Sequence, residues 1–239
     1  TKDLLNLPEK TVIDEVLDMA PDHQLLYSNI CEGIVDQVDK VKLSVTNLLA
    51  MVTRLRQATA CPAILTTENI TATKIDRCVE LCNEIISNHN KVVVFSVFKD
   101  PLNELYKRLS NYKPLLCTGD VADAIISQNI DKFQESDENS VILCTTSKMG
   151  TGITLTAASY AIFIDTPWTQ GVTQQCEDRI HRIGSGSPVF IYRLWCNNSI
   201  DMRVKKILEN KEAIGDYIVD NVRDEKTLDI LKEMITDLS

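Results

Sequence analysis

The sequence predicts an α/β domain in which a mostly parallel β-sheet is flanked by helices, with a helical N-terminal lead-in and C-terminal brace helices. From Lys74 onward, short apolar runs rich in β-branched residues alternate with stretches that repeat apolar residues at helical spacing. Strands that alternate with helices pair in parallel through right-handed crossovers. No internal repeat, low-complexity tract or long linker interrupts this order, so one domain with a lead-in and a tail accounts for the chain.

The expected elements follow from this pattern in chain order. The strands are the apolar runs at 10–17, 92–96, 115–117, 141–145, 161–164 and 188–195. The helices carry apolar residues three and four apart, at 21–34, 41–57, 74–88, 101–109, 121–135 and 225–238. Pro21 suits the first position of one helix, and Pro62 follows the end of the next. We therefore expect a lead-in over 1–73, the α/β domain over 74–214 and a brace helix over 215–239.

The composition is that of an ordinary globular protein, with 44% hydrophobic and 25% charged residues among 239. No apolar run approaches the ~20 residues needed to span a bilayer, and no signal peptide opens the chain. The first residue is Thr1 and not Met, so we expect the chain to be a fragment of a longer protein.

The eight cysteines are scattered, and none belongs to a C-x-x-C pair. Cys117 and Cys144 end apolar runs, where a thiol behaves as a small hydrophobe. This distribution predicts buried, reduced thiols and no metal site. A reducing, cytoplasmic location is the expectation, with the nucleus left open.

The net charge of −9 argues against a broad nucleic-acid-binding surface. The charge is uneven, because residues 141–210 hold seven Lys or Arg against five Asp or Glu. Any contact with phosphate is therefore expected to be local, and the affinity of the isolated chain for DNA is expected to be weak.

A cluster of phosphate-binding side chains is predicted after the loop that holds Gly150 and Gly152. Gln175, Arg179 and Arg182 fall four and three residues apart in what reads as a helix. That spacing predicts that all three side chains share one helical face. Two guanidiniums and an amide on one face suit a triphosphate, because arginine binds phosphate oxygens bidentately and stays charged.

The same region resembles a known family. It reads TTSKMGTGITLTAAS, then DTPW, then QCEDRIHRIGS, and these segments resemble motifs V and VI of the Swi/Snf-type branch of superfamily-two helicases. Their order and spacing match over more than fifty residues. Two positions depart from the family pattern: Ser147 replaces an arginine and has Lys148 beside it, and Ser185 replaces a glutamine.

Shorter segments extend the resemblance. KVVVFSVFKDPLNEL and LLCTGDVADAIISQNIDKF are similar to two segments of the family whose strand ends touch the DNA phosphate backbone. Main-chain N–H groups at such positions bind anions without reading bases. The resemblance implies nucleic-acid contacts from Ser96, Gly119, Thr145, Thr146 and Lys148, although Gly119 with its neighbouring aspartate could equally form an ordinary turn and helix cap.

The resemblance implies a RecA-like fold and half of an ATP site. In this family the nucleotide lies between two RecA-like lobes, and the first lobe supplies a G-x-x-x-x-G-K-[ST] loop and a carboxylate pair for magnesium. Neither motif occurs here, so residues 74–214 resemble the second lobe, and 1–73 the segment that joins the lobes. The implied catalytic residues are Gln175, Arg179 and Arg182, and the implied nucleotide contacts are Gly150, Gly152 and Asp165.

The expected ligands and partners follow from that half-site. ATP and Mg²⁺ are expected to be bound mainly through the absent first lobe, with double-stranded DNA held by its phosphate backbone and no membrane involved. The isolated chain is expected not to hydrolyse ATP. Beside this site, His181 is expected to pack or hydrogen-bond and not to act as a base, and Trp168 is expected to pack.

Two other function classes stay open. One is a non-catalytic RecA-fold module that binds nucleic acid or a protein partner without turnover. The other is an unrelated nucleotide-binding α/β enzyme, which the clustered motifs disfavour. Gln175, Arg179 and Arg182 favour the motor lobe of a DNA-dependent ATPase (a helicase or translocase), because a site without turnover has no physical need for two convergent guanidiniums.

Overall fold

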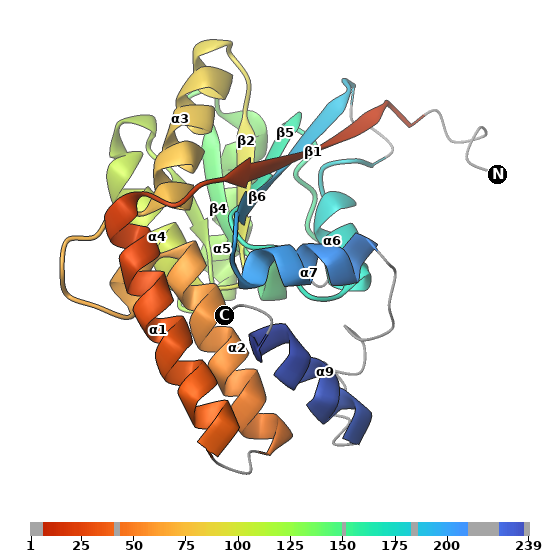
Figure 1. The fold of residues 1–239 in the computed structure, drawn as a ribbon. Helices are drawn as coiled ribbons and strands as arrows, with labels where there is room; N and C mark the ends of the chain where they lie inside the picture. The colour runs from red at the N-terminus through yellow and green to blue at the C-terminus, as the bar shows by residue number, and fades with distance from the viewer. Residues whose placement is uncertain (1–6, 41–43, 150–151, 183–185, 210–224, 237–239) are drawn as a thin grey trace. The chain divides into compact units, whose positions relative to one another are not determined.

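The computed structural model describes residues 7–40, 44–149, 152–182, 186–209 and 225–236 (Figure 1). The chain forms two compact units. The first, called here the sheet unit, takes in Thr1–Glu15, Ile75–Pro167 and Gly171–Leu194. The second, called the helical unit, takes in Val16–Lys74, Trp168–Gln170 and Trp195–Ser239. Each unit is therefore assembled from segments that are distant in sequence. The three-segment functional division expected from the sequence stays a prediction.

A six-stranded parallel sheet confirms the predicted α/β class. Its spatial order is β1 (Lys10–Leu17), β6 (Val189–Cys196), β5 (Tyr160–Phe163), β2 (Val92–Ser96), β4 (Val141–Thr145) and β3 (Leu115–Cys117). The central strands β2 and β4 are buried along their whole length, as expected for strands covered on both faces. Each strand begins and ends within about a residue of its predicted bounds.

Four helices follow the strands or precede them: α3 (Thr73–Ser87), α4 (Lys99–Arg108), α5 (Asp123–Glu135) and α6 (Gln170–Glu177). Side chains of a strand alternate between the two faces of the sheet. On one face Phe95 and Phe163 lie with ring centroids 4.9 Å apart. They share a buried cluster with Phe133 of α5 and Cys176 of α6, so these two helices cover that face.

The helical unit is built from α1 (Pro21–Lys40), α2 (Val45–Ala60), α7 (Ile200–Glu209) and α9 (Glu225–Thr236). Figure 1 shows α1 and α2 lying side by side. Ser44 caps α2 by accepting the N–H of Asn47. A buried apolar core joins the four helices and includes Leu48 and Leu55 of α2 and Leu231 of α9. The helices expected in the lead-in and the tail are thus confirmed over the described residues.

A buried ion pair lies inside the helical unit. Lys74 Nζ is 2.5 Å from Oδ2 of Asp201, and the two side chains are 0% and 5% exposed. The Asp201 carboxylate also accepts hydrogen bonds from the Thr59 hydroxyl and the Cys196 N–H, each at 2.9 Å. One carboxylate therefore ties α2, the start of α3, the end of β6 and α7 together.

His23 adds a second buried polar contact to the same unit. Its Nε2 donates to the carbonyl of Ala58 at 2.8 Å, and its Nδ1 lies 3.0 Å from the Thr73 hydroxyl. Burial lowers the pKa of His23 below its ordinary value. A neutral ring suits these two partners, because one nitrogen donates while the other accepts.

All eight cysteines lie among the described residues, and all are buried, free thiols. Burial raises the pKa of Cys176 and of Cys196 to about 12. Such thiols stay protonated and unreactive at neutral pH, which agrees with the packing role predicted for them. Among the described residues, no helix has the length and apolar character that crossing a bilayer requires.

Candidate nucleotide and nucleic-acid site

The helix expected to carry Gln175, Arg179 and Arg182 on one face is shorter than predicted. It ends at Glu177, so both arginines lie beyond it and the prediction of one shared helical face is wrong. After Glu177 the hydrogen bonds are mixed: the carbonyl of Glu177 accepts the N–H of Ile180 at 3.1 Å and that of His181 at 2.9 Å. Glu177 and Ile180 are both buried, so two buried side chains anchor this turn.

The Glu177 anchor is electrostatic. Its carboxylate receives Lys10 Nζ at 2.7 Å and Arg193 at 2.6 Å, while its own side chain is only 3% exposed. Two cations thus compensate one buried anion, as a buried carboxylate requires. No sequence pattern around Glu177 identifies these partners, since both come from distant strands.

The two arginines nevertheless converge on one segment, residues 149–154, which is called here the arginine loop. Arg179 Nε donates to the carbonyl of Met149 at 3.0 Å, and Arg182 donates to the Thr154 hydroxyl at 3.3 Å. Gly152 in this loop has φ +75°, a backbone conformation that favours glycine. Gly150, the other predicted loop glycine, lies outside the described residues.

Asp165 is buried at the end of β5 and holds the end of β2. Its two carboxylate oxygens accept the Ser96 hydroxyl at 2.5 Å and the Val97 N–H at 2.9 Å. Ser96 and Asp165 are 0% and 2% exposed. These contacts favour a positioning role for both side chains, because either one would have to give up a buried hydrogen bond to touch a ligand directly.

The remaining predicted contacts lie at the carboxyl ends of the strands. Ser96 and Thr145 are paired in register where β2 and β4 end, and the side chains of Thr145 and Thr146 are buried. Gly119 is exposed in the turn after β3. Lys148 follows β4 and donates to Asp123 at 2.9 Å. This edge, with residues 96–99, 118–123 and 145–148, is called here the strand-end edge.

The sequence interpretation missed a second lysine at this edge. Lys99 begins α4, directly after the end of β2, and its Nζ donates to both carboxylate oxygens of Asp120 at 2.7 and 2.9 Å. This hydrogen bond raises the pKa of Lys99. The sequence does contain a feature that could have identified Lys99: it lies three residues after a buried strand, at the edge where ligands of open parallel sheets bind.

Two residues beside the site take the roles expected for them. His181 Nε2 donates to the carbonyl of Pro8 at 2.7 Å, which leaves that nitrogen in a structural hydrogen bond. Trp168 packs against the core of the helical unit and lies under the guanidinium of Arg56, 4.8 Å from the ring centroid. Both contacts agree with the packing and hydrogen-bonding roles predicted from the sequence.

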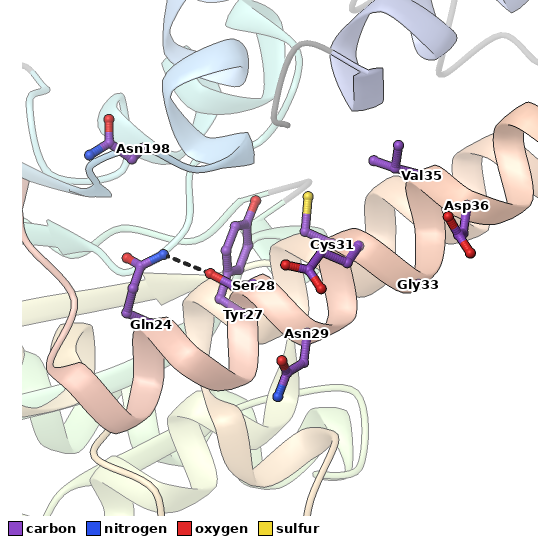
Figure 2. Close-up of a pocket in the computed structure, with 10 residues that line it drawn as sticks. Gln24, Tyr27, Ser28, Asn29, Cys31, Gly33, Val35, Asp36 and Asn198 are labelled. Carbon is purple, nitrogen blue, oxygen red and sulfur yellow. Dashed lines mark hydrogen bonds between the residues drawn. The ribbon is translucent and has the colours of Figure 1, made fainter.

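A pocket of about 670 Å³ lies elsewhere, along α1 in the helical unit (Figure 2). Its lining includes Gln24, Ser28, Glu32 and Asp36, and the Gln24 amide donates to the Ser28 hydroxyl at 3.3 Å. Two carboxylates in the lining disfavour a phosphate ligand. The arginine loop and the strand-end edge are therefore the better candidates for phosphate binding.

Comparison with known proteins gives a family match over this region. Residues 73–184 match the family described as the helicase conserved C-terminal domain, a span that contains the strand-end edge, the arginine loop and both arginines. An uncharacterized ATP-dependent helicase of Mycoplasma genitalium is 28% identical over 232 residues, which cover 95% of this chain and 22% of that protein. The chain thus has the C-terminal domain of a helicase.

Solved structures show the same fold. The crystal structure of the C-terminal part of the Fun30 ATPase domain superposes with a TM-score of 0.76 at 21% identity, covering 97% of both chains. The Sulfolobus solfataricus SWI2/SNF2 ATPase core in complex with dsDNA gives 0.77 at 21% identity, covering 97% of this chain and 52% of that one. Residues 73–184 are therefore a helicase C-terminal domain, and the chain has the fold that C-terminal lobes of SWI2/SNF2 ATPases adopt. It matches between 10% and 26% of the length of these and other curated relatives.

Proposed function

We propose that this chain is the C-terminal motor lobe of a DNA-dependent ATPase that translocates on duplex DNA or remodels proteins bound to it. The supporting observation is the convergence of Arg179 and Arg182 on the arginine loop. Arg182 is exposed beyond the end of α6, so its guanidinium can reach a phosphate brought by a facing lobe. Arginines that neutralise charge on the transferred γ-phosphoryl group raise turnover about a thousandfold or more.

The donor set of this lobe suits the phosphates of ATP and not the metal ion. Arg179 and Arg182 are permanently cationic donors, and the carboxylate of Asp165 is already engaged by Ser96 and Val97. Mg²⁺ would then be held by carboxylates of the first lobe, and it would neutralise phosphate charge when bound. We propose that Gln175, Gly150 and Gly152 make the remaining contacts of this lobe with the nucleotide.

The strand-end edge is proposed to contact the DNA backbone. Gly119 and Lys148 lie at this edge with Thr145 and Thr146, and Ser96 supports it from β2. A solved neighbour with the same fold is a complex with double-stranded DNA. Phosphate contacts of this kind position a protein on DNA without reading its sequence.

The half-site assignment predicts that this chain alone shows no DNA-stimulated ATP hydrolysis. The two-lobe protein should hydrolyse ATP, because the Walker loop and the magnesium carboxylates come from the first lobe. Steady-state phosphate release, measured with and without duplex DNA on both preparations, tests the difference. Stimulated turnover by a highly purified preparation of this chain would refute the assignment, and a two-lobe protein without turnover would favour a binding module.

The backbone-contact assignment predicts binding that does not depend on sequence. Duplexes of equal length and different sequence should bind the two-lobe protein with nearly equal affinity, and that affinity should fall as salt rises. Lys148→Gln should weaken binding to all of them alike and reduce the salt dependence by at most about one phosphate contact. Fluorescence anisotropy over a salt series gives both quantities. A sequence-specific footprint that is insensitive to salt would contradict the proposal.

A further inference from the structure

Two lysines at the strand-end edge are paired with two aspartates from one short segment. Lys99 Nζ lies 2.7 and 2.9 Å from the carboxylate oxygens of Asp120. Lys148 Nζ lies 2.9 Å from Asp123. The lysines follow β2 and β4, whereas both aspartates follow β3, in the turn after Gly119 and at the start of α5. One acidic segment therefore neutralises both cations of this edge.

These ion pairs are too exposed to hold the fold together. The side chains of Lys99 and Asp120 are 49% and 68% exposed, and those of Lys148 and Asp123 are 32% and 89% exposed. Exposed pairs of this kind change a folding equilibrium by about fivefold or less. The carboxylates can therefore move away from the lysines into water at little cost when another anion takes their place.

We propose that Lys99 joins Lys148 as a contact for DNA phosphate, and that Asp120 and Asp123 are exchangeable counter-ions which the phosphates displace. This inference rests on the proposed function. It adds Lys99 as a contact residue, and it adds Asp120 and Asp123 as residues that set the strength of DNA binding. While no DNA is bound, each aspartate occupies the place of a phosphate. The aspartates thereby weaken non-specific binding of polyanions at this edge. The net charge of −9 disfavours such binding as well.

The exchange has a signature in the salt dependence of binding. Each lysine that neutralises a phosphate of duplex DNA releases condensed cations and contributes about 0.9 to the slope of log affinity against log salt. A lysine that must leave a carboxylate contributes less, because the freed carboxylate takes up a cation from solution. Removing the carboxylate should therefore steepen the slope as well as tighten the binding.

The test measures duplex DNA binding by the two-lobe protein over a salt series. Asp120→Asn and Asp123→Asn should each tighten binding at low salt by about three- to fivefold and steepen the slope by up to about 0.9. The matched control is Glu138→Gln. Glu138 pairs with Lys113 at 2.7 Å with 73% and 66% exposure, but this pair precedes β4 and β3 and so lies at the opposite edge of the sheet. The control removes the same charge and should leave the slope unchanged.

A double-mutant cycle separates contact from long-range repulsion. Lys99→Gln should make the slope of log affinity against log salt less steep. In the Lys99→Gln background, Asp120→Asn should leave that slope unchanged, because Lys99 is no longer there to be released. An equal gain from Asp120→Asn in both backgrounds, or an equal gain from Glu138→Gln, would overturn the inference. Unchanged slopes in a protein that binds DNA would overturn it and leave the proposed function intact. Absence of DNA binding by every form would overturn both.

Discussion

Replacing Arg182 by alanine is expected to lower the DNA-stimulated ATPase rate of the two-lobe protein by about a hundredfold to a thousandfold. The guanidinium is proposed to contact charge that develops on the γ-phosphoryl group, so its loss raises the barrier far more than it weakens nucleotide binding. This corresponds to about 3–4 kcal/mol for one lost donor. Steady-state turnover and nucleotide affinity, measured on the same preparation, separate the two effects.

Two further variants test whether the loss of turnover comes from the guanidinium group of Arg182. Arg182→Lys keeps the charge but loses the planar bidentate geometry, so it should not restore turnover. Arg54→Ala removes an exposed arginine from α2 in the helical unit and should leave turnover unchanged. Arg182→Ala should melt close to the wild type, because Arg182 is exposed and its hydrogen bond to Thr154 is long at 3.3 Å. A rate within a few-fold of wild type would contradict the proposed contact of Arg182 with the γ-phosphoryl group, and an unfolded variant would give Arg182 a structural role.

The sequence was sufficient to predict the sheet, because its strands carry a strong and local signal. Runs such as 92–96 and 141–145 are β-branched, short and bounded by helical patterns, and both became fully buried strands. Burial on both faces makes a parallel strand a nearly continuous apolar run, and its short length and β-branched residues distinguish it from a buried helix. Helix ends were less well predicted, since a helix end depends on which side chains find buried partners.

The end of α6 shows why spacing alone was insufficient. Gln175, Arg179 and Arg182 have helical spacing, yet the helix ends at Glu177. The spacing also does not encode the partners at this end, because Glu177 is paired with Lys10 and Arg193 from two distant strands. The convergence of both arginines on the arginine loop still resulted, through hydrogen bonds to Met149 and Thr154 that the spacing does not encode.

The buried ion pair of Lys74 and Asp201 also could not be predicted from the sequence. Lys74 reads as the first residue of a helix, where lysine is normally solvated, and Asp201 as a residue in the first turn of another. Only the packing of the helical unit shows that both are buried against each other. Pairs separated by more than a hundred residues have no periodic signature, so they are found from the structure alone.

That pair carries the second large effect expected here. Lys74→Met should destabilise the protein by about 3–5 kcal/mol, because it leaves the buried carboxylate of Asp201 without its cation. Asp201→Asn should cost a similar amount by stranding the ammonium of Lys74, which is 0% exposed. Urea unfolding of this chain, followed by circular dichroism, measures both losses. By comparison, Lys99→Met breaks only an exposed pair with Asp120 and should change stability by less than about 1 kcal/mol.

The double variant Lys74→Met with Asp201→Asn decides whether charge is the cause. Neither charge then remains buried, and the asparagine can still accept from Thr59 or Cys196, the partners of the native carboxylate. Replacing a whole buried pair by neutral groups of similar volume is often close to neutral in stability. The double variant should therefore be more stable than either single variant. If its loss instead equalled the sum of the two single losses, the side chains would be acting independently through their packing, and the ion pair would not be what couples the start of α3 to α7.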